Sequence, residues 1–368
     1  MVTIIVPTRR RPQLLARAIR SVQAQTRGDV TIAVTDNASG DATRDVVASL
    51  MAGDPRIRYH EQPRDLGQHG NFQHALARVE TPYFTLLSDD DLLLPNFVEQ
   101  SVAALQTEPE AMFVSSPVLI VDAEGRLLMV HGAGWPVRLY RPPQGLLELT
   151  RRGHFIWTGT LFRTAVRHAV GIDPETGNSS DMDFQLQVAA RFPFATRPLP
   201  AAIFFWHPDS PSSHPGLSVF WPTWRKIMSN LEAVETLPEV AKKQAISNLD
   251  RRLHRSLVLV GLYAASRRRW QDADGSAKLL SERYRDATAA LSVRSTAWLA
   301  RRVPPMPAVL ASIAWQLRWY GRWRLGAIQR DLDKQFPQLL AVDPLPRPSP
   351  ATGEGESSKG DSSYTTVT

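Results

Sequence analysis

The chain contains no cysteine among its 368 residues. This absence excludes disulfide bonds, thiolate metal sites and a cysteine nucleophile, and it fits a protein of the reducing cytoplasm. Long apolar segments are lacking as well, because the longest uncharged runs, residues 256–266 and 303–317, fall short of the roughly 20 apolar residues of a membrane-spanning helix. In residues 1–25 the arginines follow the apolar stretch, the reverse of the order in a signal peptide. We therefore expect a cytoplasmic protein without a transmembrane segment.

Positive charge is concentrated in one part of the chain. The formal net charge is +7, yet residues 1–220 contain 20 Lys and Arg against 22 Asp and Glu. Residues 221–340 contain 21 Lys and Arg against 10 acidic residues. A basic region of this kind favours an anionic partner, either a membrane surface or a polyanionic molecule. No known nucleic-acid-binding module is visible, so we expect no nucleic-acid partner.

The first 110 residues alternate between strand and helix patterns. Apolar or alternating runs predict strands at residues 2–7, 30–36, 56–63 and 83–88. Helical spacing predicts helices between them, at residues 11–25, 41–51 (with Asp41 as N-cap) and 68–79. This βαβαβαβ order indicates an α/β fold with a doubly wound, mainly parallel sheet.

The remainder of the chain divides into three parts. Residues 112–130 predict two antiparallel strands joined at residues 122–126, and strand-turn-helix and helix patterns follow up to residue 206. Residues 216–335 have helical spacing with many Trp and Arg, and residues from 342 on are rich in Pro, Ser, Gly and Thr. We therefore expect an α/β domain at 1–215, a helical basic and aromatic region at 216–340, and a disordered tail at 341–368.

Polar side chains follow three of the predicted parallel strands: Thr8, then Asp36 with Asn37, and then Asp89 to Asp91. Ligands of parallel sheets bind at the carboxyl ends of the strands, so we expect these side chains at one edge. Adjacent carboxylates repel each other unless a cation offsets them, and oxygen ligands suit Mg²⁺ or Mn²⁺ with substrate phosphates. A solvated turn that caps the next helix is the alternative for the aspartates.

Four segments, at residues 2–26, 34–43, 64–72 and 86–95, resemble family 2 glycosyltransferases in their order and spacing. The resemblance covers about residues 1–215 and implies a GT-A-like fold with an Asp-x-Asp or Asp-Asp metal motif. It also implies inverting transfer of a sugar from a UDP- or GDP-sugar to the hydroxyl of a glycan or lipid-linked acceptor. Mn²⁺ or Mg²⁺ would be the cofactor, and synthesis of surface polysaccharide or glycan the expected role.

The resemblance further implies roles for single residues near the nucleotide. The expected pocket for base and ribose consists of Pro7, Thr8, Asp36 and Asn37, and the backbone is expected to approach the nucleotide at Gly67, Gly70 and Asn71. An Asx-turn or loop-capping role is the alternative for Asp36.

The expected metal ligand is Asp90, followed by Asp89, through ribose or a metal-bound water, and by Asp91. The choice among them stays open, because Ser88 stands where the family often has another Asp. His207 matches the histidine of a loop that closes over the diphosphate, with Phe205 in place of the arginine, so a diphosphate or metal-ligand role is expected for it. A loop-packing histidine is the alternative, and His214 is a weaker candidate.

An inverting transfer needs a base that removes the proton of the acceptor hydroxyl. Asp181 matches the position of this catalytic carboxylate in the family, with Ser180 in place of the usual acidic neighbour. An N-cap of the following helix is the alternative role for Asp181, and Asp183 is expected to be structural or to support the site.

Two questions stay open at the level of sequence. Residues 315–325 interleave Trp and Tyr with Arg, which is typical either of a helix in a membrane interface or of a helix that covers the catalytic domain. Two other functions also remain, a sugar-nucleotide nucleotidyltransferase and an inactive nucleotide- or glycan-binding module. The first would carry a glycine-rich loop after the opening strand, and residues 7–13 contain no glycine.

Overall fold

The computed structural model describes residues 1–206 and 216–310, together with residue 334. The strands are β1 (Val2–Thr8), β2 (Val30–Asp36), β3 (Ile57–Glu61), β4 (Tyr83–Leu86), β5 (Leu92–Leu93), β6 (Phe113–Ser115), β7 (Val118–Val121), β8 (Leu127–His131), β9 (Leu139–Tyr140), β10 (Thr160–Arg163), β11 (Phe194–Thr196) and β12 (Ala202–Phe205). The α-helices are α1 (Pro12–Gln23), α2 (Thr43–Gly53), α3 (Gly67–Ala77), α4 (Phe97–Thr107), α5 (Gln144–Arg152), α6 (Ser180–Arg191), α7 (Leu217–Glu232), α8 (Glu239–Ser266), α9 (Trp270–Glu282) and α10 (Ala287–Arg302). Three 3₁₀ segments complete the set, namely η1 (Trp157–Gly159), η2 (Thr164–His168) and η3 (Pro174–Ser179).

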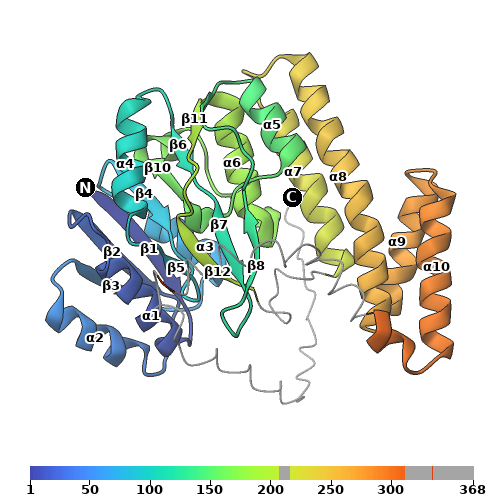
Figure 1. Ribbon diagram of the computed structural model, residues 1–368, viewed down its shortest axis with the longest axis horizontal. Helices are drawn as coiled ribbons and strands as arrows, with labels where there is room; N and C mark the ends of the chain where they lie inside the picture. Colours follow the sequence, from blue (N-terminus) through green and yellow to red (C-terminus); the bar gives the residue numbers. More distant parts are fainter. Residues whose placement is uncertain (207–215, 311–333, 335–368) are drawn as a thin grey trace, which may run out of the picture.

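The main sheet has eight strands in the order β3-β2-β1-β4-β10-β6-β11-β9 (Figure 1). Its first four strands are parallel, as the sequence predicts for residues 1–110. The other half is mixed, since β10 runs antiparallel to both β4 and β6, while β11 is parallel to β6. A second sheet of four strands has the order β5-β12-β7-β8 and contains the predicted antiparallel pair β7 and β8.

Helices cover both faces of the parallel half, and β1 shows how. Ile5 belongs to an apolar cluster with residues of α3, whereas Ile4 and Val6 belong to another with residues of α1 and α4. All three side chains are fully buried. Because successive residues of a strand point to opposite faces, a strand covered on both faces is mainly apolar, and the one polar residue inside β1, Thr3, has its hydroxyl hydrogen-bonded to that of Thr81 at 2.7 Å.

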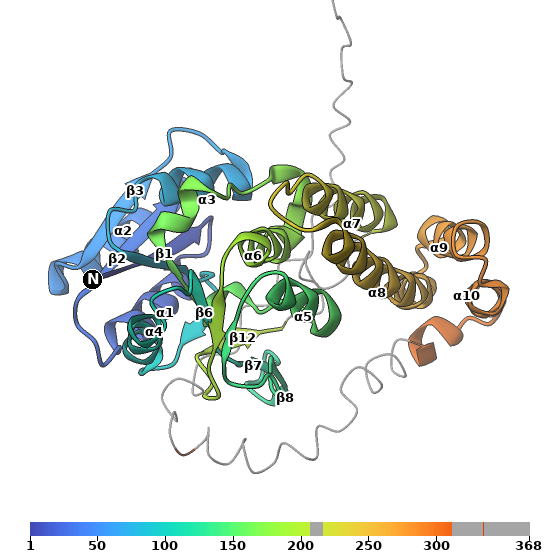
Figure 2. The same ribbon diagram turned by 90° about the horizontal axis from the view of Figure 1, so that it is seen from above.

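Helices α7 and α8 complete the core of the α/β domain rather than forming a separate unit (Figures 1 and 2). One apolar cluster joins Phe184 and Phe194 to Trp224 of α7 and Leu253 of α8. In Figure 2 the α9–α10 hairpin lies beyond α8, on the side away from the main sheet. The predicted boundary near residue 215 thus falls just before α7, but the core continues across it.

Two local predictions are corrected by the structure. The helix predicted after the strand at 160–163 is the short 3₁₀ segment η2. Helix α2 begins at Thr43 with Ala42 at its N-cap position, so Asp41 lies one residue further out. Its Oδ1 still accepts a hydrogen bond from the Thr43 N–H at 3.0 Å, because an aspartate ahead of a helix can satisfy a free N–H of the first turn.

Several predicted features lie outside the described residues. These are His207, His214, the basic and aromatic segment at 315–325 and the tail at 341–368. Within the part that is described, no helix combines the length and the hydropathy needed to cross a membrane.

Candidate active site

The ends of β1 and β4 meet at the point where the sheet changes its winding direction. The Thr8 hydroxyl, at the end of β1, donates a hydrogen bond of 2.8 Å to Asp89 Oδ2, just beyond β4. The Asn37 N–H donates to the Thr8 carbonyl at 3.0 Å, which brings the end of β2 to the same place. The chain leaves β1 towards β2 and β3 on one side, and then returns to place β4 on the other side of β1. A doubly wound sheet binds its ligand at such a point.

Asp89 and Asp90 share one cation, Arg11. The Arg11 Nη1 lies 3.1 Å from Asp89 Oδ1 and 3.1 Å from Asp90 Oδ2. Asp89 is buried, whereas 35% of the Asp90 side chain is exposed. Burial and the neighbouring Asp90 raise the pKa of Asp89 to about 6, and Arg11 and the Thr8 hydroxyl oppose that rise. Arg11 was not among the predicted site residues, although it lies in the short loop between β1 and α1.

Asp91 has a different environment from its two neighbours. Its Oδ2 accepts a hydrogen bond from the Thr158 hydroxyl at 2.8 Å, and its Oδ1 accepts one from the Phe205 N–H at 3.2 Å. The side chain is buried, and burial raises the pKa of Asp91 well above its usual value. We therefore give Asp91 a structural role, tying the turn after β4 to η1 and β12, in place of the metal ligand that was predicted.

Asp89 and Asp90 could hold a divalent cation only if substrate phosphates and waters completed its coordination shell. Among the described residues there is no group of three His, Asp or Glu side chains placed to hold a metal. Mg²⁺ and Mn²⁺ often take just one or two carboxylates and complete their shell with waters and substrate phosphates. Two carboxylates already bridged by one guanidinium form such a donor set, because the excess negative charge attracts a cation.

The residues expected to border the base and ribose are connected by hydrogen bonds within and between loops. The partly exposed Pro7 lies in β1, just before Thr8. Asp36 accepts hydrogen bonds from the Ser39 N–H at 3.0 Å and the Tyr59 hydroxyl at 2.6 Å, as a loop-capping side chain would. Burial and the Asp36 carboxylate both raise the pKa of the Tyr59 phenol, which therefore stays a donor at neutral pH.

The loop before α3 is held to the end of β2. The Asn37 side chain donates to Asp65 Oδ1 at 2.6 Å and accepts from the Leu66 N–H at 2.8 Å. Gly67 follows with φ +71°, a left-handed conformation that glycine adopts without strain. At Gly70 a side chain would come within 3.0 Å of Leu66 Cβ, so the glycine permits close packing inside this loop and helix.

Asn71 does not face an open site. The buried Asn71 amide donates to the Thr35 carbonyl at 2.9 Å and accepts from the Thr35 hydroxyl at 2.7 Å and from Gln62 Nε2 at 3.1 Å. A nucleotide contact by this side chain would require these hydrogen bonds to break. The Asn71 side chain thus fastens α3 to β2, while the predicted approach of the backbone to the nucleotide at this residue stays a prediction.

Asp181 lies in the first turn of α6, and Ser179 is the N-cap residue. The capping alternative is thus not realised by Asp181. Its Oδ2 is 3.4 Å from His154 Nε2, its Oδ1 accepts from the Met182 N–H at 2.7 Å, and 24% of the side chain is exposed. His131 Nε2 lies 2.9 Å from the His154 carbonyl oxygen. Neither histidine carries a local sequence signal, because only the tertiary structure brings them to Asp181.

The loop before α6 is anchored on the helix that borders the expected nucleotide pocket. His69 of α3 has its Nε2 2.8 Å from the Gly177 carbonyl oxygen of η3. On the other side of α6, Asp183 is buried and accepts hydrogen bonds from Asn230 of α7 at 3.2 and 3.3 Å. Asp181 is therefore held between these two contacts, whereas Asp183 joins α6 to α7.

Residues 3–171 match the family described as Glycosyl transferase family 2. The match confirms the predicted resemblance to family 2 glycosyltransferases for this part of the chain, and the mixed α/β architecture agrees with the predicted GT-A-like fold. Over 93 residues, 25% of its length, it is 41% identical to GalNAc(5)-diNAcBac-PP-undecaprenol beta-1,3-glucosyltransferase of Campylobacter jejuni. Over 138 residues, 37% of its length, it is 27% identical to chondroitin synthase of Escherichia coli. The matches span 30% and 20% of these two relatives.

Among solved structures, the fold is similar to that of S. aureus TarS 1-349 in complex with UDP-GlcNAc. The TM-score is 0.58, with 14% sequence identity, and the match covers 86% of this chain and 91% of that chain. The likeness therefore extends beyond the α/β domain into the helices that follow it.

Proposed function

We propose that this chain transfers a sugar from a nucleoside-diphosphate sugar to an acceptor hydroxyl, with inversion at the anomeric carbon. The observation that carries this proposal is the junction of Thr8, Asp89 and Asp90 at the sheet's change of winding direction. A donor whose nucleotide contacts the ends of β1 and β2 would bring its diphosphate to the aspartates. Asp36 and Asn37 would border the base, and Gly67 would let the backbone approach the nucleotide.

Asp181 is the proposed base. The acceptor oxygen attacks the anomeric carbon, the bond from that carbon to the diphosphate oxygen breaks, and the hydroxyl proton passes to the Asp181 carboxylate. No covalent sugar–enzyme intermediate is required. His154, 3.4 Å from Asp181 Oδ2, would hold the carboxylate in place.

Asp90 and Asp89 are the residues that would hold Mn²⁺ or Mg²⁺. When bound, the ion neutralises negative charge that develops on the leaving diphosphate. Arg11 would have to leave at least one of the two carboxylates, or turn towards the phosphates, for both oxygens to become available. Asp90 is the better candidate because its carboxylate is the more exposed of the two.

A UDP- or GDP-sugar donor and a glycan or lipid-linked acceptor are the substrate classes we propose. Two relatives support them by their names, one an undecaprenol-diphosphate glucosyltransferase and the other a chondroitin synthase. Synthesis of a polysaccharide or surface glycan is the corresponding role.

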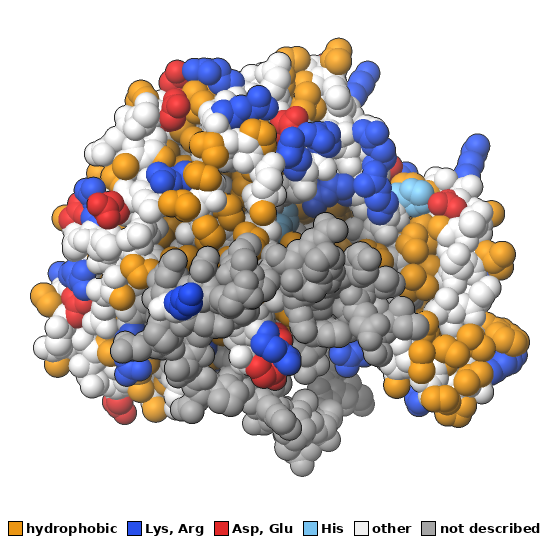
Figure 3. All heavy atoms as spheres, viewed as in Figure 1, with side chains coloured by type: hydrophobic (Ala, Val, Ile, Leu, Met, Phe, Trp, Pro, Cys, Tyr) orange, Lys and Arg blue, Asp and Glu red, His pale blue; other side chains and the backbone are white. Residues whose placement is uncertain are grey.

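We also propose that the α9–α10 hairpin rests on an anionic membrane, which would place this cytoplasmic enzyme on the inner face. Trp298 is 53% exposed and Leu291 is 64% exposed, and both lie on α10 seven residues apart, on one face of the helix. Arg302 lies over the Trp298 ring, 4.3 Å from its centroid. Figure 3 shows hydrophobic side chains gathered at the lower right, where Figure 1 places the lower end of this hairpin. Exposed rings beside arginines match an anionic lipid surface.

A screen of nucleotide-sugars tests the proposed reaction. We expect one UDP- or GDP-sugar to raise the melting temperature in the presence of Mn²⁺. The enzyme should also hydrolyse this donor slowly to UDP or GDP and free sugar, and chelator should abolish both effects. A nucleotidyltransferase would instead release pyrophosphate from a nucleoside triphosphate and a sugar phosphate. Stabilisation without any turnover would support the inactive binding module.

A further inference from the structure

Arg252 of α8 is a partly buried cation that has no anionic partner among the described residues. Its guanidinium carbon lies 5.7 Å from the centroid of the Trp224 ring. It forms no hydrogen bond or ion pair with any residue in the described part of the chain. Burial, with a further contribution from Arg255, lowers the pKa of Arg252. A buried charge is costly unless it is paired, so such a site suits an anionic ligand.

The surroundings of Arg252 lead directly to the proposed base. Arg252 Nη2 would lie 3.5 Å from a side-chain carbon at Gly153, whose φ is +117° and which precedes His154. The pKa of His131 is lowered, chiefly by burial. The charge of Asp181 raises this pKa, whereas the charge of Arg252 lowers it. His131 Nε2 lies 2.9 Å from the His154 carbonyl oxygen, and His154 Nε2 lies 3.4 Å from Asp181 Oδ2. Through Gly153 and His154, Arg252 is thus connected to Asp181, the proposed base.

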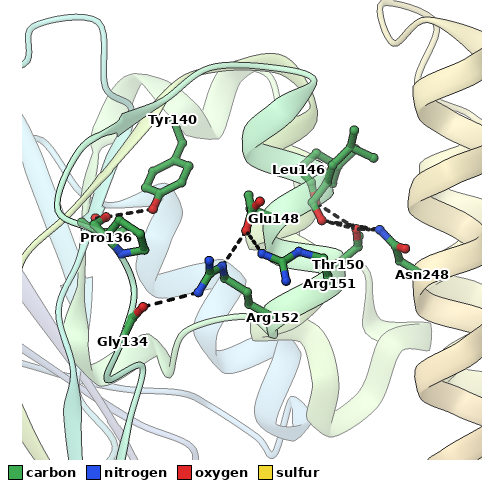
Figure 4. A network of polar contacts seen from close by, with 11 residues as sticks. Gly134, Pro136, Tyr140, Leu146, Glu148, Thr150, Arg151, Arg152 and Asn248 are labelled. Carbon is green, nitrogen blue, oxygen red and sulfur yellow. Dashed lines mark hydrogen bonds and ion pairs between the residues drawn. The ribbon is translucent and has the colours of Figure 1, made fainter.

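Basic side chains gather on the surface over α5 and α8 (Figure 3). Arg151 and Arg152 of α5 share a single carboxylate, that of Glu148, at 2.6 and 2.5 Å (Figure 4). Arg255, one turn beyond Arg252, has no hydrogen bond or ion pair with the described residues. Positive charge therefore exceeds negative charge among these side chains of α5 and α8.

The same α5–α8 contact holds Arg252 in position. The Asn248 side chain of α8 donates to the Thr150 hydroxyl of α5 at 3.1 Å (Figure 4). Asn248 lies one turn before Arg252 on the same helix, and Leu249 and Leu253 between and beyond them are fully buried. A guanidinium on a helix fixed in this way is ready to bind without a rearrangement of the backbone.

We propose that Arg252 binds a phosphate group of the acceptor, next to the hydroxyl that receives the sugar. The inference rests on the proposed role of Asp181 as the base. A guanidinium presents paired N–H donors that match two phosphate oxygens, so arginine is well suited to this contact. The donor diphosphate is not the ligand of Arg252, since the proposed place for that group is at Asp89 and Asp90. The phosphate would come either from the lipid carrier of a growing glycan or from a phosphodiester polymer.

Calorimetric titration of inorganic phosphate into the full-length chain tests this inference, with Mn²⁺ and saturating UDP present to occupy the donor site. We compare wild type with Arg252→Gln, which keeps most of the side-chain stem over Trp224. Arg294→Gln is the matched control. Arg294 is an exposed residue of α10 outside the site, and its substitution removes the same charge as Arg252→Gln does. We expect phosphate affinity to fall at least tenfold in Arg252→Gln and to stay within twofold in Arg294→Gln. Equal affinity in all three proteins overturns the inference, provided circular dichroism shows the variants folded.

Two competitors then identify the source of the phosphate. Farnesyl phosphate in detergent represents the lipid carrier, and glycerophosphoglycerol represents a phosphodiester polymer. Displacement of inorganic phosphate by either compound from wild type, and from Arg294→Gln alike, supports the inference and names the source. Displacement by neither means that the site takes only an adventitious ion, which overturns it. UDP binding to wild type with Mn²⁺ is scored separately, so failure there counts against the proposed function and not against Arg252.

Discussion

Arg11 donates a hydrogen bond from Nη1 to Asp89 Oδ1 at 3.1 Å, across the carboxyl end of the parallel sheet. The same nitrogen lies 3.1 Å from Asp90 Oδ2, so one guanidinium offsets both of the proposed metal ligands. A side chain in this position competes with a divalent cation for the carboxylates. This competition can be tested without any substrate.

Arg11→Gln should strengthen the binding of free Mn²⁺ by roughly tenfold, because it removes a positive charge next to the site of a doubly charged ion. Titration of Mn²⁺ followed by electron paramagnetic resonance, without nucleotide, measures this affinity. Arg27→Gln is the control, since Arg27 pairs with Asp29 away from the sheet edge. Weaker Mn²⁺ binding in Arg11→Gln would show that the two carboxylates need Arg11 to stay in place.

Asp90→Ala should impair ligand binding and transfer, whereas Asp91→Ala should impair the stability of the fold. Asp90→Ala should leave the melting temperature nearly unchanged and abolish both transfer and Mn²⁺-dependent nucleotide binding. Asp91→Ala should destabilise the fold by about 2 kcal/mol or more, because the Thr158 hydroxyl and the Phe205 N–H lose their buried acceptor. Urea unfolding and calorimetry with UDP measure the two effects. An unfolded Asp90→Ala, or full activity in chelator, would contradict the metal role.

Asp181→Asn should lower turnover by roughly 10²–10⁴-fold and leave donor and Mn²⁺ affinity nearly unchanged. Asparagine keeps the shape of the side chain, and its oxygen still accepts from the Met182 N–H, but it cannot take up the proton. Steady-state kinetics with the identified donor and calorimetry with UDP separate the two quantities. Asp183→Asn is the matched control two residues along α6. An active Asp181→Asn enzyme would move the proposed base elsewhere.

Asp183 should make the stability of the protein depend on pH. Burial raises its pKa to about 6 in the folded state, against hydrogen bonds from Asn230, and the ordinary value is 3.8. Between these values the folded state binds more protons than the unfolded state, so the contribution of Asp183 to stability falls as pH rises from 4 to 6. Relative to low pH, the free energy of unfolding falls by at most about 3 kcal/mol, and this fall is complete at pH 7.

Asp183→Asn removes this dependence, since its amide does not titrate. The difference in unfolding free energy between Asp183→Asn and wild type should therefore favour the variant more at pH 7 than at pH 4.5. Urea unfolding of both proteins at several pH values gives the difference, in which the titrations of other groups largely cancel. A difference that is independent of pH would contradict the raised pKa.

The α9–α10 hairpin should mediate membrane contact. Trp298→Ala should weaken co-sedimentation with anionic liposomes severalfold, and high salt should weaken that of wild type. Val240→Ser, at an exposed apolar residue of α8, is the control and should bind like wild type. Truncation before α7 does not test the same idea, because it would expose the core that α7 and α8 cover. No salt-sensitive binding by the full-length protein would rule out the membrane proposal.

The order of strands and helices in residues 1–110 was determined by the sequence alone. Apolar strands covered on both faces and amphipathic helices carry periodic patterns that arise within a few neighbouring residues. The same patterns place Thr8, Asp36 and Asp89 at strand ends, so their meeting at one edge follows from the parallel order of the sheet. The mixed half of the sheet was less predictable, because its strands are short and pair across long distances in the sequence.

Only the tertiary structure decided what each polar side chain contacts. The three adjacent aspartates look alike in sequence, yet Asp91 is buried against Thr158 and Phe205 while Asp90 stays half exposed, because neighbouring residues in a turn face different surroundings. Asn71 is likewise committed to Thr35. Arg252 lies some hundred residues from His154 along the chain, and no local pattern could place it beside the proposed acceptor site. Packing of α8 against α5 brings it there, since burial of leucines fixes the helix and with it the direction of the charge.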